Sequence, residues 1–146
     1  KMNILCIDYG EKRVGLSYSD EVGIALPLPA AVEPDFESRI AHIAREVSSK
    51  KIELILVGYP YNMDGSTGFK AKEVDAFIER LKKEFPTLKF DTADERLSSF
   101  QVENDMNFFS KKKKSVKQKR KYRKSGDIDS RSSAVVLQEY LDNASL

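Results

Sequence analysis

The sequence has very little cysteine and histidine and no long hydrophobic run. It contains a single cysteine, Cys6, and a single histidine, His42. These counts exclude an intrachain disulfide and the usual Cys/His zinc clusters. We expect His42, in the middle of a helix, to be an ordinary surface residue rather than part of a Ser-His-Asp system. No apolar run approaches the roughly 20 residues of a membrane helix, and the first is too short for a signal peptide. We therefore expect a cytoplasmic protein with no membrane partner.

The charge of the chain is divided between an acidic body and one basic segment. The formal net charge is only +2, yet residues 111–124 (KKKKSVKQKRKYRK) hold ten of the 25 basic side chains and no acidic one. The rest of the chain has 15 basic and 23 acidic residues, a balance of −8. A run of like charge is typical of a mobile arm that binds nucleic-acid backbones, and the alternative is a solvated loop without function. The candidate phosphate-binding residues are Lys111, Lys112, Lys113, Lys114, Lys117, Lys119, Arg120, Lys121, Arg123 and Lys124.

The order of the predicted elements indicates an α/β fold. The length of 146 residues, 40% hydrophobic and 33% charged, fits one globular domain over residues 1–146. Apolar periodicity predicts strands at 3–8, 14–19, 24–32, 52–57 and 88–92, and helices at 36–49, 67–85, 98–109 and 128–141. Pro27 and Pro29 place the third strand at an edge. We therefore predict a mixed five-stranded sheet, with an antiparallel meander on one side and parallel strands on the other, flanked by helices.

Carboxylates occur where the predicted parallel strands end. Asp8 closes the first apolar run, and residues 91–96 (DTADER) lie at the end of the last strand. Sites in open α/β sheets form at the carboxyl ends of the strands, so both groups should open on one edge. A carboxylate at the end of a buried strand is costly to desolvate unless a partner pairs with it. A metal ion is one such partner.

Two further aspartates stand at the start of the last predicted helix. At 3.6 residues per turn, Asp129 lies on one stripe with Ser133, Val136 and Tyr140, which we predict to face the core. Asp127 lies about 200° away and is expected to cap or precede the helix, and simple N-capping is the alternative for either aspartate. Acids from three elements suit Mg²⁺ or Mn²⁺, and two such ions can activate water for attack on a phosphodiester.

Four segments, in order along the chain, resemble the motifs of the YqgF/RuvX family. They are residues 8–15 (DYGEKRVG), 57–66 (VGYPYNMDGS), 94–99 (DERLSS) and 127–141, which begins with DIDS. Together they span nearly the whole chain. The resemblance implies an RNase H-like fold and a nuclease that acts on pre-16S rRNA or on Holliday junctions. An actin-like phosphotransferase would need two lobes, which 146 residues do not supply.

The resemblance also implies which acids carry the chemistry. Asp8, Glu95 and Asp129 correspond to the family's metal-binding acids, which selects Glu95 where spacing alone leaves Asp94 open. Asp8 would bridge two Mg²⁺ or Mn²⁺ ions, with Glu95 and Asp129 completing their coordination. The implied activity is a metal-dependent endonuclease acting on structured nucleic acid, with the 5′ end of pre-16S rRNA as the favoured substrate. A Holliday junction resolvase and a non-catalytic nucleic-acid-binding protein of the same fold are the alternatives.

Further polar side chains stand beside these motifs. We expect Lys12 and Arg13 to neutralise a phosphate, or else to form only a charged hairpin turn. Arg96 is expected to bind phosphate or orient Glu95, with an intrachain salt bridge as the alternative. The sequence leaves open the choice between RNA and DNA and between monomer and homodimer, although cutting a four-way junction predicts a dimer. The rim of the site, or else a simple turn, is expected to comprise Tyr61, Asn62, Asp64 and Gly65, with Tyr61 a candidate for base stacking.

Overall fold

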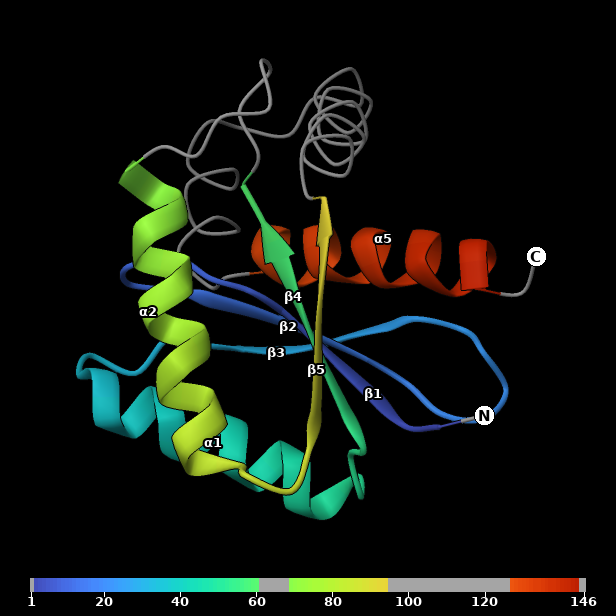
Figure 1. Ribbon diagram of the computed structural model, residues 1–146, viewed down its shortest axis with the longest axis horizontal. Coiled ribbons are helices and arrows are strands. Elements are labelled where there is room, and N and C mark those ends of the chain that lie inside the picture. The colour runs from blue at the N-terminus through green and yellow to red at the C-terminus, as the bar shows by residue number, and fades with distance from the viewer. Residues whose placement is uncertain (1, 61–68, 95–126, 145–146) are drawn as a thin grey trace, which may run out of the picture.

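A mixed five-stranded sheet forms the centre of the molecule. The computed structural model describes residues 2–60, 69–94 and 127–144 (Figure 1). The strands are β1 (Ile4–Asp8), β2 (Val14–Ser19), β3 (Leu26–Ala31), β4 (Leu54–Tyr59) and β5 (Lys89–Asp94), in the order β3-β2-β1-β4-β5. The first three form an antiparallel meander, and β4 and β5 continue the sheet parallel to β1. The predicted sheet and the edge position of the proline-containing strand are confirmed.

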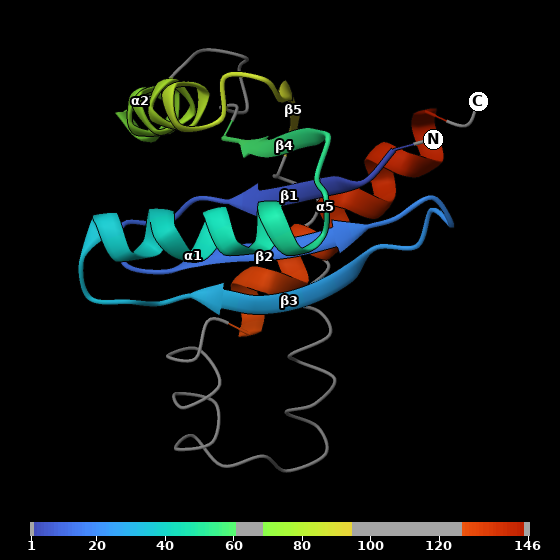
Figure 2. The same cartoon turned by 90° about the horizontal axis from the view of Figure 1, so that it is seen from below.

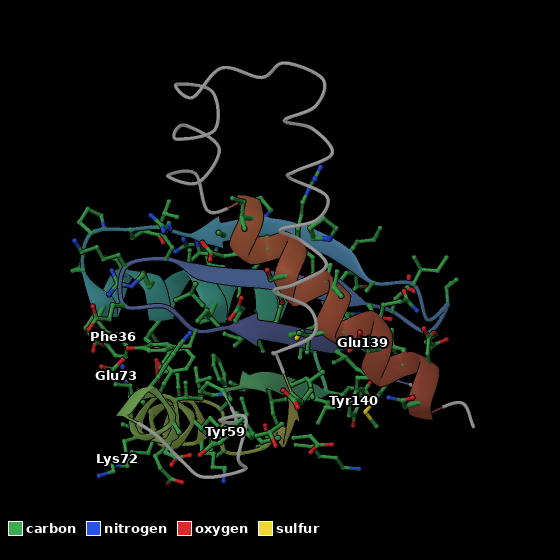
Figure 3. The ribbon with its side chains drawn as sticks, turned by 90° about the horizontal axis from the view of Figure 1, so that it is seen from above. Phe36, Tyr59, Lys72, Glu73, Glu139 and Tyr140 are labelled. Atoms are coloured by element: carbon green, nitrogen blue, oxygen red, sulfur yellow. The ribbon has the colours of Figure 1, made fainter. Side chains whose placement is uncertain are left out.

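Helices cover both faces of this sheet. In the described part of the chain these are α1 (Phe36–Ser49), α2 (Phe69–Glu84) and α5 (Asp127–Ala144). Figures 2 and 3, which view the sheet from opposite sides, show α1 on one face and α5 on the other. Asp35 caps α1, because its carboxylate accepts a 2.8 Å hydrogen bond from the backbone N–H of Ser38. Among the described residues, no helix combines the length and the hydropathy that a membrane span requires.

The two-residue period of the strands sorts the core into two layers. In β1, Leu5 and Ile7 pack in the cluster that includes residues of α1 and α2, whereas Ile4 and Cys6 pack in the cluster that includes residues of α5. Because side chains alternate along a strand, Asp8 lies on the same side as Ile4 and Cys6. The first predicted site residue is therefore placed on the face covered by α5.

Two strands begin later than the periodicity predicts. In each case a backbone N–H just before the strand donates its hydrogen bond to a helix instead of to a neighbouring strand. The predicted strand at 52–57 starts at Leu54, because Lys51 has a φ of +52° and the N–H of Ile52 donates to the carbonyl of Val47 in α1. The predicted strand at 24–32 starts at Leu26, because the N–H of Ala25 donates to the side chain of Gln138. Both starting residues are therefore wrong in the sequence analysis.

The ends of the other elements also differ slightly from expectation. β5 continues to Asp94 rather than ending at residue 92, and Asp127 is the first residue of α5 rather than a residue before it. The predicted helix at 98–109 lies outside the described residues. The small shifts matter here because they bring Asp94 to the edge where the parallel strands end.

Candidate active site at the carboxyl edge of the sheet

The three parallel strands end side by side at one edge of the sheet. Asp8 ends β1, Tyr59 ends β4 and Asp94 ends β5. Ile7 pairs with Val57, and Tyr59 pairs with Asp94, so the strand ends are in register. In Figure 1, β4 and β5 run in the same direction toward this edge. The expected convergence of the strand ends is confirmed for the described residues.

Gly15 brings Asp8 and Asp129 to the same place. Asp8 and Gly15 are partners in the β1–β2 ladder. A β-carbon at Gly15 would stand 2.1 Å from the carbonyl oxygen of Asp129 and 2.8 Å from its β-carbon. Asp8 and Asp129, which are far apart in the sequence, therefore flank one glycine. Only a residue without a side chain allows α5 to approach the strand this closely.

Buried serines fix the position of α5 on the sheet. The hydroxyl of Ser133 donates to the carbonyl of Cys6 at 2.8 Å and lies 2.7 Å from the hydroxyl of Ser17. Ser17 and Ser133 are completely buried, as expected for the stripe that also carries Asp129. These contacts confirm that the Asp129 stripe faces the core. The roles of Ser17 and Gly15 were missed, although their i, i+2 spacing with Ser19 marks one strand face made of small residues.

A third serine contact lies where the β2–β3 ladder is irregular. Val14 pairs with Ala31 and Leu16 pairs with Leu28, so the register shifts between them. The skipped residues of β3 include Pro29, which has no N–H to donate. At this point the N–H of Leu16 donates to the hydroxyl of Ser130 in α5, at 3.2 Å. The first turn of α5 is therefore held against β2 by side-chain bonds next to Asp129.

The carboxylate of Asp129 is partly buried and attracts positive charge. Burial raises its pKa, while the charge and hydrogen bond of Arg13 and the charge of Lys70 lower it, and the net direction is upward. The Nε of Arg13 donates to Oδ2 of Asp129 at 3.2 Å. In this structure Arg13 thus contacts one of the predicted metal-binding acids. Lys70, in the first turn of α2, contributes the second positive charge.

Arg39 holds the turn between β1 and β2 in place. This arginine is only 8% exposed, and its guanidinium donates to the carbonyl of Glu33 at 2.6 Å and to the carbonyl of Glu11 at 3.1 Å. It therefore connects α1 to the turn that carries Lys12 and Arg13. This role could not be predicted, because no local pattern distinguishes a buried arginine from the exposed charges of an amphipathic helix.

His42 is not the ordinary surface residue that we expected. Its Nδ1 lies 2.8 Å from the Oε2 of Glu33, and its side chain is 17% exposed. The expectation was wrong because Glu33, in the segment before α1, covers this part of the helix. His42 and Arg39 both contact Glu33, and neither contact involves the predicted acids.

The structure brings together some of the predicted site residues and does not describe others. Asp8, Arg13 and Asp129 gather around Gly15, and Lys12 is exposed in the same turn. Among the residues that the structure describes, no three His, Cys, Asp or Glu side chains are close enough to hold a metal ion. The remaining predicted residues lie outside the described ranges; they are Glu95, Arg96, Tyr61, Asn62, Asp64, Gly65 and the basic residues between Lys111 and Lys124.

The arrangement of strands and helices defines an RNase H-like fold. A structure of Thermus thermophilus RuvC with a Holliday junction substrate superimposes with a TM-score of 0.54, over 99% of this chain and 96% of that one, at 11% sequence identity. At this identity the likeness shows the fold alone.

Sequence comparison shows the family. The family model described as "RuvX: Holliday junction resolvase" matches residues 2–143. A protein of Opitutus terrae is 40% identical over 141 residues, covering 97% of this chain and 92% of that protein. One of Synechococcus elongatus is 34% identical over 139 residues, covering 94% and 87%. Both carry the name "Putative pre-16S rRNA nuclease". The chain belongs to the RuvX family, and the resemblance seen in its motifs is confirmed.

Proposed function

We propose that this protein is an endonuclease that hydrolyses phosphodiester bonds in structured RNA, with the 5′ end of pre-16S rRNA as its substrate. The observation that carries the proposal is the meeting of Asp8 and Asp129 at Gly15, on the edge where the parallel strands end. The names of the relatives favour RNA as the substrate. The family description and the RuvC-like fold favour the second candidate, cleavage of four-way DNA junctions.

The acids at this edge fit a divalent cation. Asp8 and Asp129 supply carboxylate oxygens, which Mg²⁺ and Mn²⁺ prefer. Burial raises the pKa of Asp129, so its ionised form gains from a cation placed beside it. Glu95, the residue after the last residue of β5, is the third proposed ligand. When bound, two such ions would supply an activated water and stabilise the leaving oxygen of the phosphodiester.

Side chains of the β1–β2 turn are proposed to bind the substrate phosphate. Arg13 uses its Nε to contact Asp129, and the guanidinium carries further N–H donors suited to phosphate oxygens. Lys12 is exposed beside it. Arg39 binds the carbonyl of Glu11 in the same turn, so it positions these cations without contacting the substrate.

The basic segment is proposed to bind the nucleic-acid backbone at a distance from the phosphodiester that is cut. Its ten basic residues between Lys111 and Lys124 contrast with the acidic balance of the rest of the chain. Phosphate contacts of this kind give affinity without sequence preference. Specificity for one substrate therefore has to come from contacts nearer the edge of the sheet.

A cleavage assay on two substrates tests the proposal. The full chain is incubated with a pre-16S rRNA fragment that carries its 5′ extension and with a four-way DNA junction, in Mg²⁺, Mn²⁺ or EDTA. We expect metal-dependent cutting of the RNA and a loss of roughly 100-fold or more in Asp8→Asn and Asp129→Asn, since even the outer partners of metal ligands cost 10- to 100-fold. Asp142→Asn, at the other end of α5, is the matched control and should cut normally.

The alternatives give different results in the same assay. Cutting of the junction but not the RNA, by a dimer in solution, would support the resolvase, because two symmetric cuts need two-fold related sites. Equal cleavage by wild type and Asp8→Asn would show a contaminating nuclease and refute the catalytic assignment. Binding without metal-dependent cutting of either substrate would support the non-catalytic alternative.

A further inference from the structure

A pocket of about 450 Å³ lies on the opposite side of the sheet edge from Asp129. Its walls come from the turn after β1, the start of α1 and one side of α2. Tyr9 lines it and directly follows Asp8 in the chain, so strand alternation directs the two side chains to opposite sides of the edge. The volume falls within the range of roughly 300–1,000 Å³ typical of small-molecule sites. The proposed acids do not use this pocket.

Three aromatic rings, those of Tyr9, Phe36 and Phe77, are among the lining of this pocket. The rings of Tyr9 and Phe77 are 4.6 Å apart between centroids and tilted by 39°, and Phe36 meets Phe77 edge to face at 6.3 Å. Phe77 is 4% exposed and belongs to the core, whereas Tyr9 and Phe36 are only partly buried. Partly exposed aromatic rings beside a nucleic-acid path are typical stacking platforms for bases.

The charges of the pocket disfavour a phosphate. The cation among its described lining residues, Arg80, is already engaged, because its two terminal nitrogens contact the carboxylate of Glu37 at 2.6 and 2.7 Å. Two carboxylates, those of Glu11 and Glu73, are also among the lining residues. In Figure 3, Glu73 lies on the side of α2 that faces Phe36, and Lys72 lies on the far side. The pocket therefore offers acceptors to a ligand that presents N–H donors.

We infer that this pocket binds a single unstacked nucleobase of the substrate, with guanine preferred over uracil. This inference rests on the proposed function, since it places a base on one side of the edge while the phosphate lies near Asp8 on the other. Guanine presents two neighbouring N–H donors on its pairing edge, which one carboxylate such as that of Glu73 can accept together. Uracil presents one N–H between two carbonyl oxygens, which the carboxylates repel. The aromatic rings supply the stacking that either base requires.

Binding of two oligonucleotides tests the pocket separately from cleavage. The full chain with Asp8→Asn is titrated in EDTA against fluorescein-labelled octauridylate and against the same octamer with one central guanine, and anisotropy is followed. We expect the guanine-containing octamer to bind on the order of tenfold more tightly, as stacking and carboxylate contacts of one base allow. The added changes Glu73→Gln and Tyr9→Leu should each abolish most of this difference. Tyr9→Phe, which keeps the ring, should retain it.

The controls separate a local effect from misfolding and from loss of activity. Glu79→Gln changes an exposed carboxylate of the same helix outside the pocket and should keep the preference. Glu73→Gln preserves size, so its result counts even where Tyr9→Leu fails to fold.

Equal affinity for the two octamers overturns the inference. If triarginine also displaces both octamers, the acidic pocket binds a cationic partner instead of a base. Wild-type cleavage in Mg²⁺ without guanine preference overturns the pocket alone. Guanine preference without cleavage overturns the nuclease proposal alone.

Discussion

Gly15 lies directly against the backbone of Asp129, which is far along the chain in the first turn of α5. A β-carbon at position 15 would stand 2.1 Å from the carbonyl oxygen and 2.2 Å from the carbonyl carbon of Asp129. Atoms of the main chain cannot rotate away from such a contact, so α5 would have to move. The same glycine pairs with Asp8. The spacing between the two aspartates thus depends on the absence of one methyl group.

Gly15→Ala should therefore damage both stability and activity. Overpacking a filled interior typically costs about 1–3 kcal/mol, and here the obstructing atoms belong to the backbone of a helix. We expect urea unfolding to show a loss in this range or above, and cleavage to fall more than stability alone explains, because Asp129 is displaced from Asp8.

The control for this change is Gly23→Asn. Gly23 has a φ of +87° and no atom within 4 Å of a β-carbon placed there. Asparagine tolerates this conformation better than most residues, so we expect a loss below about 1 kcal/mol and normal cleavage. A Gly15→Ala protein with wild-type stability and rate would contradict the close approach of α5.

The partly buried Asp129 should make the metal-free protein less stable at neutral pH. Burial raises the pKa of Asp129 in the folded protein, against the opposing charge of Arg13. A carboxyl group whose pKa is raised on folding holds its proton more tightly in the folded state. Stability therefore falls as the pH rises from the ordinary aspartate pKa, about 3.9, through the raised value. Asp129→Asn cannot ionise and avoids this loss.

Thermal unfolding in EDTA as a function of pH measures the effect. We expect Asp129→Asn to melt above wild type at pH 7, with the difference vanishing below the ordinary aspartate pKa. Arg13→Gln removes the charge that lowers the pKa of Asp129, and should extend the pH interval over which stability is lost. Asp142→Asn controls for the loss of one negative charge on α5. A lower melting temperature for Asp129→Asn at pH 7 would show that the Arg13 contact outweighs the burial.

The paired hydroxyls of Ser17 and Ser133 predict a non-additive double mutant. Both side chains are completely buried, 2.7 Å apart, and Ser133 also donates to Cys6. Ser133→Ala leaves the hydroxyl of Ser17 without this partner, which should cost about 1–3 kcal/mol. Replacing both serines by alanine removes both polar groups, so the double variant should lose less than the sum of the single losses.

Chemical denaturation of the four proteins of this cycle provides the measurement. Ser48→Ala, at an exposed position of α1, is the control and should stay within about 0.5 kcal/mol of wild type. Strictly additive losses would mean that the two hydroxyls stabilise the protein independently of each other.

Local patterns in the sequence were sufficient to predict the mixed sheet and the core-facing side of the last helix. The order of apolar runs gives the strands and helices of the sheet, and the 3.6-residue period assigns Asp129 to the core side of α5. The first residues of β3 and β4 were wrong because distant groups decide them. The side chain of Gln138 takes the N–H of Ala25, and the end of α1 takes the N–H of Ile52.

The connections that build the site could not be read from the sequence. Arg39 donates a hydrogen bond to the carbonyl of Glu11, which is 28 positions away in the sequence. The hydroxyl of Ser130 accepts one from the N–H of Leu16, which is 114 positions away. Neither pair produces a periodic signal, because each depends on how two complete elements pack. Asp8 was accessible to sequence reasoning for a different reason: desolvation makes a carboxylate at the end of a buried strand conspicuous. Spacing could not choose between Asp94 and Glu95, and Glu95 lies outside the described residues.

The basic segment predicts a specific salt dependence of binding. If residues 111–114 each neutralise one phosphate, changing all four lysines to glutamine should lower the slope of log affinity against log salt by about 0.9 per contact on a duplex, or about 0.7 on a single strand. The control changes four exposed lysines elsewhere, which alters net charge equally. These are Lys72, Lys82, Lys83 and Lys89.

Asp8→Asn protein titrated with a labelled RNA duplex between roughly 50 and 200 mM salt gives both slopes. We expect the 111–114 variant to lose about three to four units of slope and the control to lose less than one. The rest of the chain is acidic. Replacing four lysines there changes the net charge and weakens long-range attraction, but it should remove no contact that releases counterions from the nucleic acid. An equal loss in the two variants would therefore show that net charge, and not the segment at 111–124, governs binding to nucleic acid.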